Sequence, residues 1–579
     1  MVVGRLNRES NPVPGEKPGF TPQHKLPDGS FIDTGEANPL PTKDDLVYQE
    51  LDILKQLISD QQALTKKVEV TNQKFTQTVD GTVGINNFPT DQKVSDSDVL
   101  TKLSELDSKI NGIIDGSTPA DTQLVGSSVE ELISNQKTII NVMQSDKLVF
   151  GVHWDKTSDP VMTRLDASIG LEANVGVDGQ LVKNDFDRMP IYSEISEVTD
   201  SLGNKFIRIP KFYIRKRSGK DFMIKQISKT KYPGFYLPNC FLDFENNKEL
   251  DFFDFGKHKA SLSADSKLES KSGEYPLINK NIVQFRTYAQ NNNDATAMVN
   301  GYQQLDIHAY DVLQTLFYVE FATLDSQSIM RGFTAGEYSG SHIATVAESG
   351  TNRIIVANAT ADAFRSGGSI SLGTSRGGNQ ITYGRTITAI GVYDVDNKTV
   401  VFDGGPVDIA IGNYLYNTGW KSGYSADIAS FSGSIGSNSD GKYPCVYRGI
   451  ESPWGDTYQF VDGVNINDNQ TWVAKNANDY ASNVFASPYE KLSYINLNAN
   501  GYVTEMGLDN KNPFAEFPVE IGGSNYYADY YYQNSGQRIA HVGGGWVSGS
   551  SAGLSCWYLA FSSAYAVVSI GGRLLKKAL

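Results

Sequence analysis

Apolar side chains between residues 42 and 147 recur at spacings of three and four residues in three short stretches, broken near Gly81, Pro89 and Pro119. This spacing places them along one narrow helix edge, as in a coiled coil. Each stretch is too short to be a stable helix alone. We therefore expect residues 46–147 to form a segmented coiled-coil stalk, and the isoleucines and valines at the seam favour a homotrimer over a dimer. A helical bundle within one chain is the alternative. The seam residues are Leu51, Leu54, Ile58, Leu103, Leu106, Ile110, Ile139 and Met143.

The pattern differs on both sides of this stretch. Residues 1–45 contain seven prolines, which block helix formation and remove hydrogen-bond donors, so they predict an extended arm. From residue 148 the apolar positions alternate with period two, for example in 149–155 and in 205–214, where a strand pair or one strand with a proline break is expected. A wide apolar face predicts one helix over 308–323. Residues 331–440, rich in Gly, Ser and Thr, predict a β-rich insertion within a head of residues 148–579.

Composition narrows the function classes. The net charge is -15, which argues against a nucleic-acid partner, and the basic cluster at residues 211–220 is interpreted as a solvated strand face. Three scattered cysteines form neither a disulfide framework nor a zinc site and suggest folding in a reducing cytoplasm. The sequence contains no run of about 18 apolar residues, so membrane insertion is not expected. The first residues lack the apolar core of a signal peptide.

The segment 522–574 combines glycines with aromatic and small polar residues, the composition of binding loops. No nucleophile and base stand together in it. The tyrosines at 526, 527, 530, 531 and 532 could stack against sugar rings, but the period of a strand predicts that about half of them face a core. The segment therefore indicates a recognition surface.

A family resemblance emerges from the order of several motifs. The motifs are residues 151–155, 206–213, 284–290, 316–323, 447–455 and the terminal stretch from Gly543–Trp546 to Gly571–Arg573. This order resembles tail or fibre proteins of phages that infect Gram-positive bacteria, over residues from about 149 to 579. The body is similar to the C-type lectin fold shared by phage tropism determinants, variable proteins of diversity-generating retroelements and the formylglycine-generating enzyme. The fold class expected is thus α+β multidomain: an extended arm, a segmented trimeric coiled-coil stalk and a C-type lectin-like head with a β-rich insertion.

The resemblance implies a ligand-facing surface between the Gly-Gly-Trp and the terminal Gly-x-Arg motifs. Residues 546–573 contain no asparagine, which departs from the retroelement pattern and argues against programmed diversification. No redox-active cysteine pair matches the enzyme branch, since Cys556 has no partner nearby in the sequence, and it is interpreted as a core residue. No catalytic residues are therefore expected. The ligand-binding residues implied are Trp546, Ser548, Ser550, Ser555, Trp557, Tyr558, Phe561 and Tyr565.

No metal or other cofactor is expected. Residues Asp462, Asn465, Asn467 and Asp468 form an oxygen-rich segment that could suit calcium, but the spacing does not match a dedicated calcium loop and a solvated turn is favoured. A glycan-cleaving pair of carboxylates would have to lie in a groove, and the sequence singles out no such pair.

These observations predict a phage virion fibre protein, assembled in the host cytoplasm, that is not an enzyme. The arm would contact other virion proteins, and the head would bind the host surface, with a bacterial cell-wall glycopolymer as the expected ligand. Several copies per particle would multiply a weak single-site affinity. The alternative is a structural or decorating head or neck fibre with little receptor affinity. Whether the fibre sits on the tail or the capsid stays open.

Overall fold

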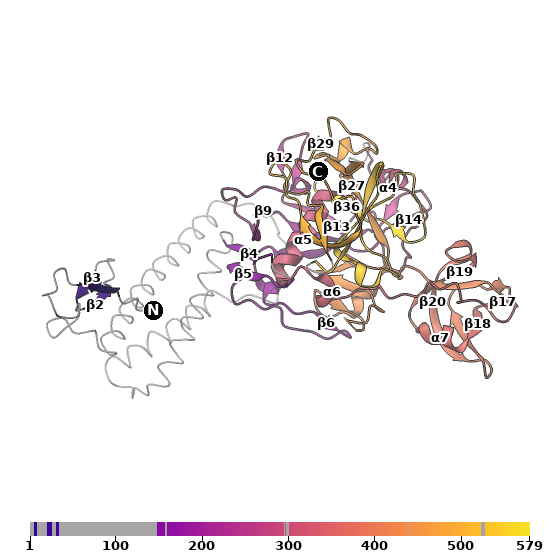
Figure 1. The fold of residues 1–579 in the computed structure, drawn as a ribbon. Coiled ribbons are helices and arrows are strands. Elements are labelled where there is room, and N and C mark those ends of the chain that lie inside the picture. The colour runs from indigo at the N-terminus through magenta and orange to yellow at the C-terminus, as the bar shows by residue number, and fades with distance from the viewer. Residues whose placement is uncertain are drawn as a thin grey trace, which may run out of the picture. The chain divides into compact units, whose positions relative to one another are not determined.

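The computed structural model describes residues 148–579 except 157–158, 295, 297–299, 438 and 523–526, together with three short strands near the N-terminus (Figure 1). The chain divides into two compact units, Met1–Thr122 and Gln123–Leu579, which are described separately. In the first unit the three strands pair in one antiparallel sheet, so the residues predicted to form an extended arm contain paired strands. They are β1 (Arg5–Arg8), β2 (Phe20–Lys25) and β3 (Phe31–Asp33).

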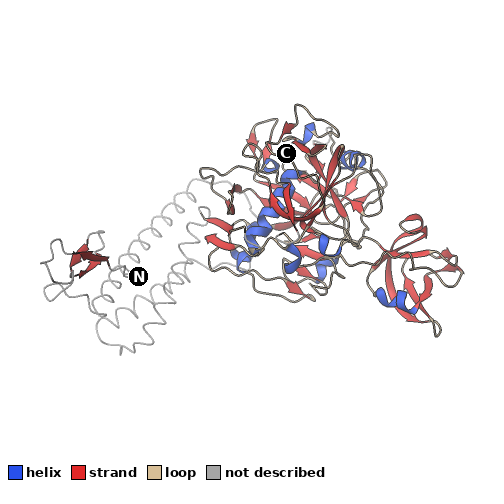
Figure 2. Cartoon of the chain, in the orientation of Figure 1, coloured by secondary structure: helices blue, strands red, loops and turns tan. Residues whose placement is uncertain are grey.

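The predicted fold class is wrong. The structure is strand-rich, with 38% strand and 13% helix, and a curled β half-barrel takes the place of the expected α+β lectin-like arrangement (Figure 2). Among the described residues the longest helix has 15 residues, and no long coiled-coil helix of a trimeric stalk is present. The eight predicted seam residues, from Leu51 to Met143, lie outside the described residues.

The half-barrel is built on the largest sheet, which has nine strands. Its strand order is β29-β28-β27-β33-β34-β32-β30-β31, with β35 paired to β27. Most pairs are antiparallel, but β32 runs parallel to β34, and β35 runs parallel to β27. The strands are β27 (Tyr458–Asn467), β28 (Gln470–Val473), β29 (Glu490–Lys491), β30 (Gly501–Met506), β31 (Pro518–Gly522), β32 (Tyr530–Gln533), β33 (Gln537–Gly543), β34 (Gly553–Leu559) and β35 (Ile570–Gly571).

Smaller sheets surround this one, in the orders β5-β4-β10-β9, β16-β36-β13-β8-β7 and β26-β25-β24-β6, with hairpins β11-β12 and β14-β15. The two strands expected within 205–214 exist as β8 and β9, but they belong to different sheets rather than to one hairpin. The bounds are β4 (Val149–Trp154), β5 (Thr163–Asp166), β6 (Gly176–Val177), β7 (Ser196–Thr199), β8 (Lys205–Pro210), β9 (Tyr213–Ser218), β10 (Met223–Ser228), β11 (Leu242–Asp243), β12 (Lys248–Glu249), β13 (Phe252–Gly256), β14 (Ser261–Leu262), β15 (Leu268–Glu269), β16 (Tyr302–Gln304), β24 (Gly433–Ser434), β25 (Cys445–Tyr447), β26 (Ile450–Glu451) and β36 (Leu574–Lys577).

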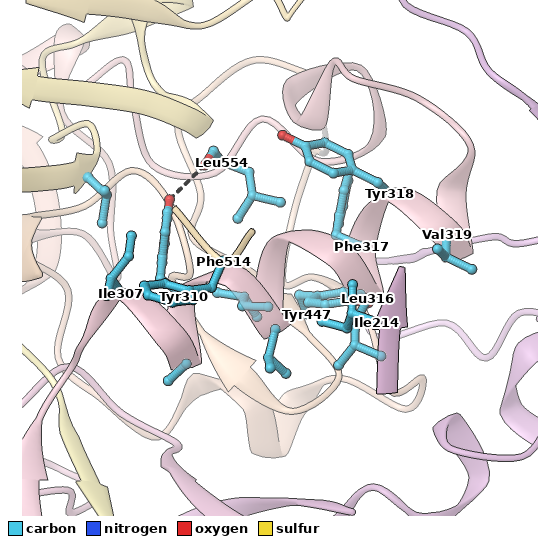
Figure 3. Packing of buried hydrophobic residues seen from close by; sticks show 14 of the residues in the cluster. Ile214, Ile307, Tyr310, Leu316, Phe317, Tyr318, Val319, Tyr447, Phe514 and Leu554 are labelled. Carbon is cyan, nitrogen blue, oxygen red and sulfur yellow. Dashed lines mark hydrogen bonds between the residues drawn. The ribbon is translucent and has the colours of Figure 1, made fainter. Parts of the chain in front are cut away.

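The helix predicted over 308–323 is confirmed as α5 (Ile307–Phe321). All fifteen of its residues are buried, including the charged Asp311 and Glu320, which form ion pairs with Lys216 and Arg448. Its side chains pack into the main core, and the hydroxyl of Tyr310 donates to the carbonyl oxygen of Leu554 on β34 at 2.7 Å (Figure 3). The other helices of the body are α4 (Ile282–Gln290), α6 (Ser326–Ile329) and the 3-10 turns η2 (Asp185–Arg188), η3 (Tyr192–Glu194), η4 (Asn239–Phe241), η5 (Tyr424–Asp427), η6 (Ala477–Asp479) and η7 (Gly549–Ser551).

An inserted lobe, defined here as residues 337–417, lies within the range predicted to be a β-rich insertion. The chain enters and leaves it side by side, since the amide of Glu337 donates to the Asn417 side chain at 2.6 Å and the amide of Asn417 to the Glu337 carbonyl at 2.9 Å. The lobe has its own apolar core. Its elements are β17 (Glu348–Thr351), β18 (Arg353–Ala357), α7 (Asn358–Ala363), β19 (Ser369–Ser375), β20 (Gly378–Val392), β21 (Asn397–Phe402), β22 (Val407–Ile409) and β23 (Tyr414–Asn417).

Candidate functional site

Three of the eight predicted ligand-binding residues are inside the protein. Trp546, Ser555 and Trp557 have exposed fractions of 1%, 1% and 0%, so the expectation that they are displayed is wrong. The ring of Trp557 lies 5.6 Å from the ring of Tyr310 and 4.5 Å from that of Phe517. Strand β34 runs through the middle of the half-barrel sheet, with α5 against it, so most of its side chains are covered.

The other five predicted residues reach the surface. Ser550 is exposed, and Ser548, Tyr558, Phe561 and Tyr565 are half-buried. Tyr558 follows Trp557 directly, and successive side chains of a strand point to opposite faces, which explains why one is buried and the next is not. The same alternation separates the tyrosines of β32.

In β32 and the residues before it, Tyr527 and Tyr531 are buried, whereas Tyr530 and Tyr532 are half-buried. The prediction that about half of these tyrosines are structural is therefore confirmed for the four that the structure describes. Tyr526 lies outside the described residues.

The half-buried rings form a continuous pile, defined here as Tyr532, Tyr558, Phe561 and Tyr565. Ring centroids are 4.4 Å apart between Tyr532 and Tyr558, 4.8 Å between Tyr558 and Phe561, and 3.6 Å between Phe561 and Tyr565. The interplanar angles fall from 30° to 23° to 15° along the pile. Rings within the pile cover each other's faces, so they offer edges and hydroxyls to solvent, and only a terminal ring can offer a face.

Three further tyrosines widen this pile into what we call the aromatic surface. Tyr530 lies 4.6 Å from Tyr532 and Tyr502 lies 5.1 Å from Tyr530, while Tyr458 packs edge-on against Tyr558 at 5.5 Å. These residues come from β27, β30, β32, β34 and the segment after β34, which the sheet brings side by side. The seven members are Tyr458, Tyr502, Tyr530, Tyr532, Tyr558, Phe561 and Tyr565, all of them half-buried.

The hydroxyl groups of Tyr458, Tyr532 and Tyr558 remain protonated at neutral pH. Burial raises the pKa of Tyr532 to about 12, and burial also raises the pKa values of Tyr458 and Tyr558. The hydroxyl of Tyr502 shares a hydrogen bond with Ser550 at 3.1 Å, and that of Tyr458 shares one with Ser548 at 3.2 Å. The surface thus presents neutral groups that can both donate and accept hydrogen bonds.

A buried histidine supports the pile from below. His541 is fully buried, and burial lowers its pKa to about 4. Its Nδ1 lies 3.1 Å from the carbonyl oxygen of Tyr558, and its ring lies 4.8 Å from Phe460 and 5.9 Å from Phe561. A neutral imidazole packed on three sides gives the pile a rigid base.

A hollow of about 390 Å³ opens where the pile ends at Tyr565. Because Phe561 covers one face of Tyr565 at 3.6 Å, a molecule in the hollow could meet only the remaining parts of that ring. The lining residues are Asn279, Tyr338, Gly377, Trp546, Val547, Tyr565, Ala566, Val567, Val568 and Ser569. None of them is charged, and two come from the inserted lobe.

Two buried lysines of the body are paired with carboxylates. Lys216 is buried and forms ion pairs with Asp311 and Glu516, and Lys225 pairs with Glu516 at 2.5 Å. Burial opposes the charge on Glu516, but the two lysines hold its pKa at about 2. The interpretation of residues 211–220 as a solvated strand face is therefore wrong for Lys216.

The cysteines of the chain are buried and free. Burial raises the pKa of Cys445 to about 12 and raises those of Cys240 and Cys556 well above the usual range. The interpretation of Cys556 as a core residue is confirmed, with an exposed fraction of 0%. A thiol with a raised pKa is a poor nucleophile at neutral pH.

The favoured solvated turn is confirmed for only half of the candidate calcium segment: Asn467 and Asp468 are exposed at the end of β27 and in the turn after it, whereas Asp462 and Asn465 are buried in the strand itself. Both carboxylate oxygens of Asp462 accept from Arg286 at 2.7 Å, and one of them also accepts from Gln304. Within the part of the chain that the structure describes, no group of three or more His, Cys, Asp or Glu side chains is placed to hold a metal ion.

Three aromatic residues of the site were missed in the sequence: Tyr338, Tyr458 and Tyr502. Tyr458 and Tyr502 lie at or near the starts of strands, far from the terminal segment, and only the pairing of those strands brings them to it. Period-two alternation in β30, where Tyr502 precedes the buried Val503, is the one signal that could have indicated its exposure.

No protein-family model matches this chain, and no curated protein has a matching sequence. Of the helices in the described ranges, none has both the length and the apolar character needed to cross a membrane.

Proposed function

We propose that this protein is a phage virion fibre protein that binds the host cell surface, with a glycopolymer of the envelope as its ligand, through its carboxy-terminal body. The observation that carries the proposal is the aromatic surface, seven half-buried rings beside a hollow of about 390 Å³. The virion location rests on the motif order described above, which resembles phage fibre proteins.

The chemistry of the aromatic surface suits sugars. Pyranose rings have apolar C–H faces that pack against aromatic rings, and their hydroxyls need partners that donate and accept. Tyrosine supplies both in one side chain and loses little conformational entropy when it is held in place. The pile is held by ring contacts and by the neutral His541, so a ligand would not have to order it.

A binding experiment tests the proposal. The full chain is incubated with purified host cell walls, and the bound fraction is measured for wild type, Tyr558→Ala and Tyr565→Ala. Tyr565→Ala removes the terminal ring of the pile, and Tyr558→Ala removes a ring edge and a hydroxyl within it. An aromatic contact is worth about 0.5–1.5 kcal/mol beyond its area, so we expect each substitution to weaken binding up to roughly tenfold. Tyr393→Ala is the matched control, because Tyr393 is 42% exposed on the inserted lobe and is not part of the aromatic surface.

Loss of binding in both variants with the control unchanged supports the site. A wild-type chain that binds no host envelope would contradict the proposal and favour the alternative, a structural or decorating fibre. A chain that binds as well after both substitutions would keep the adhesive role but remove it from this surface.

A further inference from the structure

The hollow beside Tyr565 is formed by two parts of the chain. Tyr338 and Gly377 come from the inserted lobe, whereas Trp546, Val547 and Tyr565 come from the body. If the aromatic surface binds a sugar chain, the lobe stands at one end of it. The lobe residues that line the hollow therefore indicate what the lobe contributes to binding.

Contacts between lobe and body hold the walls of the hollow in place. The hydroxyl of Tyr383 on β20 donates to the carbonyl oxygen of Pro276 at 2.6 Å, and Thr386 shares a hydrogen bond with Tyr275 at 2.8 Å. Beside the lobe's entry point, the amide of Gly336 donates to the carbonyl oxygen of Trp546 at 2.6 Å. The hollow is thus formed before any ligand arrives, and a ligand need not bring its two walls together.

A glycine fixes the lobe side of the hollow. Gly377 has a φ of +72°, in the left-handed region, and a Cβ at this position would lie 2.0 Å from the hydroxyl oxygen of Tyr338. The turn between β19 and β20 therefore passes directly over the Tyr338 hydroxyl, which only glycine permits. The Tyr338 ring is also braced edge-on by Tyr416, with centroids 5.7 Å apart.

A positive charge stands next to this turn. Arg376 is exposed, and its guanidinium carbon lies 5.0 Å from the centroid of the Tyr338 ring. Within the described ranges no carboxylate lies within ion-pair distance of Arg376, in contrast to Arg353 of the same lobe, which pairs with Glu348 at 2.6 Å. Arg376 does not itself line the hollow, but it lies over Tyr338, which does, and no lining residue is acidic. An anionic group bound at this edge of the hollow would therefore have the guanidinium as its nearest charged partner.

We propose that the hollow is a specificity subsite in which Tyr565 contacts a sugar unit and Arg376 of the inserted lobe pairs with an anionic substituent on that unit. This inference rests on the proposed function and adds to it the charge of the ligand. The overall charge of -15 repels anions at long range, so the preference would come from this local contact rather than from steering.

The experiment measures affinity of the full chain for three soluble polysaccharides: one neutral, one with phosphodiester groups and one with uronic acids. We expect wild type to bind a charged polymer on the order of tenfold more tightly than the neutral one, the effect of one charge-assisted contact, and to lose the difference in high salt. The phosphodiester and uronic acid arms identify which anion is recognised.

Substitutions in the lobe test whether it causes the preference for charged over neutral polysaccharides. Arg376→Gln should bind the charged polymer only as well as the neutral one, and Arg376→Lys should keep part of the preference because it keeps the charge. Arg353→Gln is the matched control, since it removes an arginine of the lobe that is already paired, and it should behave as wild type.

The outcomes separate this inference from the proposed function. If Tyr558→Ala and Tyr565→Ala lose binding while Arg376→Gln keeps the wild-type preference, the subsite is wrong and the aromatic surface stands. If wild type does not distinguish the charged from the neutral polymers, or binds none of the three, the subsite is wrong as well. Circular dichroism of each variant checks that the fold is intact.

Discussion

At the scale of single residues, two adjacent residues of β34 have different roles, one in stability and the other in ligand binding. Trp557 is fully buried against Tyr310 and Phe517, whereas Tyr558 is half-buried in the pile. Substitution of a buried tryptophan by alanine leaves a cavity and costs about 3–5 kcal/mol, so Trp557→Ala should lower the free energy of unfolding by that amount. Tyr558→Ala should cost clearly less and act on ligand binding instead. Urea unfolding of both variants measures the difference, and equal losses would contradict this division.

The sequence predicted a recognition segment but not which of its residues are exposed. Trp546, Ser555 and Trp557 were expected at the surface because the resemblance points to the whole stretch between two motifs. Ser555 and Trp557 are buried because α5 covers β34, with Phe517 also against Trp557. Trp546, in contrast, is buried in a separate cluster with Phe333 and Trp420. All of these partners lie far away in the sequence. Period-two alternation, by contrast, is a local property, and it correctly separated the tyrosines of β32 into two faces.

At the scale of elements, α5 is the one helix that the apolar pattern predicted well. Its N-cap is Asp306, whose carboxylate accepts from the amide of Ala309 at 2.9 Å and also from Gln303 and Tyr480. Asp306→Ala removes the cap, which costs about 0.5–2 kcal/mol, and leaves two buried donors without a partner, at about 1–3 kcal/mol each. We therefore expect a loss of at least about 2 kcal/mol in urea unfolding.

A matched comparison isolates these two contributions. Asp325 caps the short α6 through the amides of Gln327 and Ser328, so Asp325→Ala should cost only about 1 kcal/mol, the value of a cap alone. If both alanine variants lose the same stability, the side-chain partners of Asp306 contribute nothing.

The inserted lobe marks the limit of sequence reasoning at this scale. Alternating runs such as Arg353–Ala357 and Asn397–Phe402 indicate strands, and both are strands. The lobe is held against the body by contacts such as the hydrogen bond between Thr386 and Tyr275, which are 111 positions apart in the sequence. No local pattern indicates such a contact. The hollow between lobe and body could not be predicted for the same reason.

At the scale of the whole molecule, the predicted fold class failed because the narrow apolar stripes in residues 46–147 and the resemblance of the head together suggested a helical stalk carrying an α+β head. The described body is instead a curled half-barrel whose strands are buried by one fully buried helix and by each other. The identity of a sheet's neighbours is a long-range property, so alternation can predict strands without predicting their order.

Protonation also acts on the stability of the body as a whole, through two buried histidines. Burial lowers the pKa values of His308 and His541 to about 4, from an ordinary value of 6.5. As the pH falls from about 6.5 to 4, the unfolded chain takes up protons that the folded chain does not, so each histidine lowers the free energy of unfolding by up to about 3 kcal/mol. Below pH 4 both states are protonated and the loss stops growing.

Buried carboxyl groups act in the opposite direction in the same range, since burial raises the pKa of Asp456 to about 6 and the folded chain then binds its proton first. The histidine contribution must therefore be measured as a difference. We expect the stability of His541→Gln relative to wild type to improve by up to about 3 kcal/mol between pH 7 and pH 4, and that of His308→Gln by a similar amount. Urea unfolding at a series of pH values provides the curves. Parallel curves for wild type and His541→Gln would mean that the imidazole beneath the aromatic pile takes up its proton at the same pH in the folded and in the unfolded chain, so that burial does not lower its pKa.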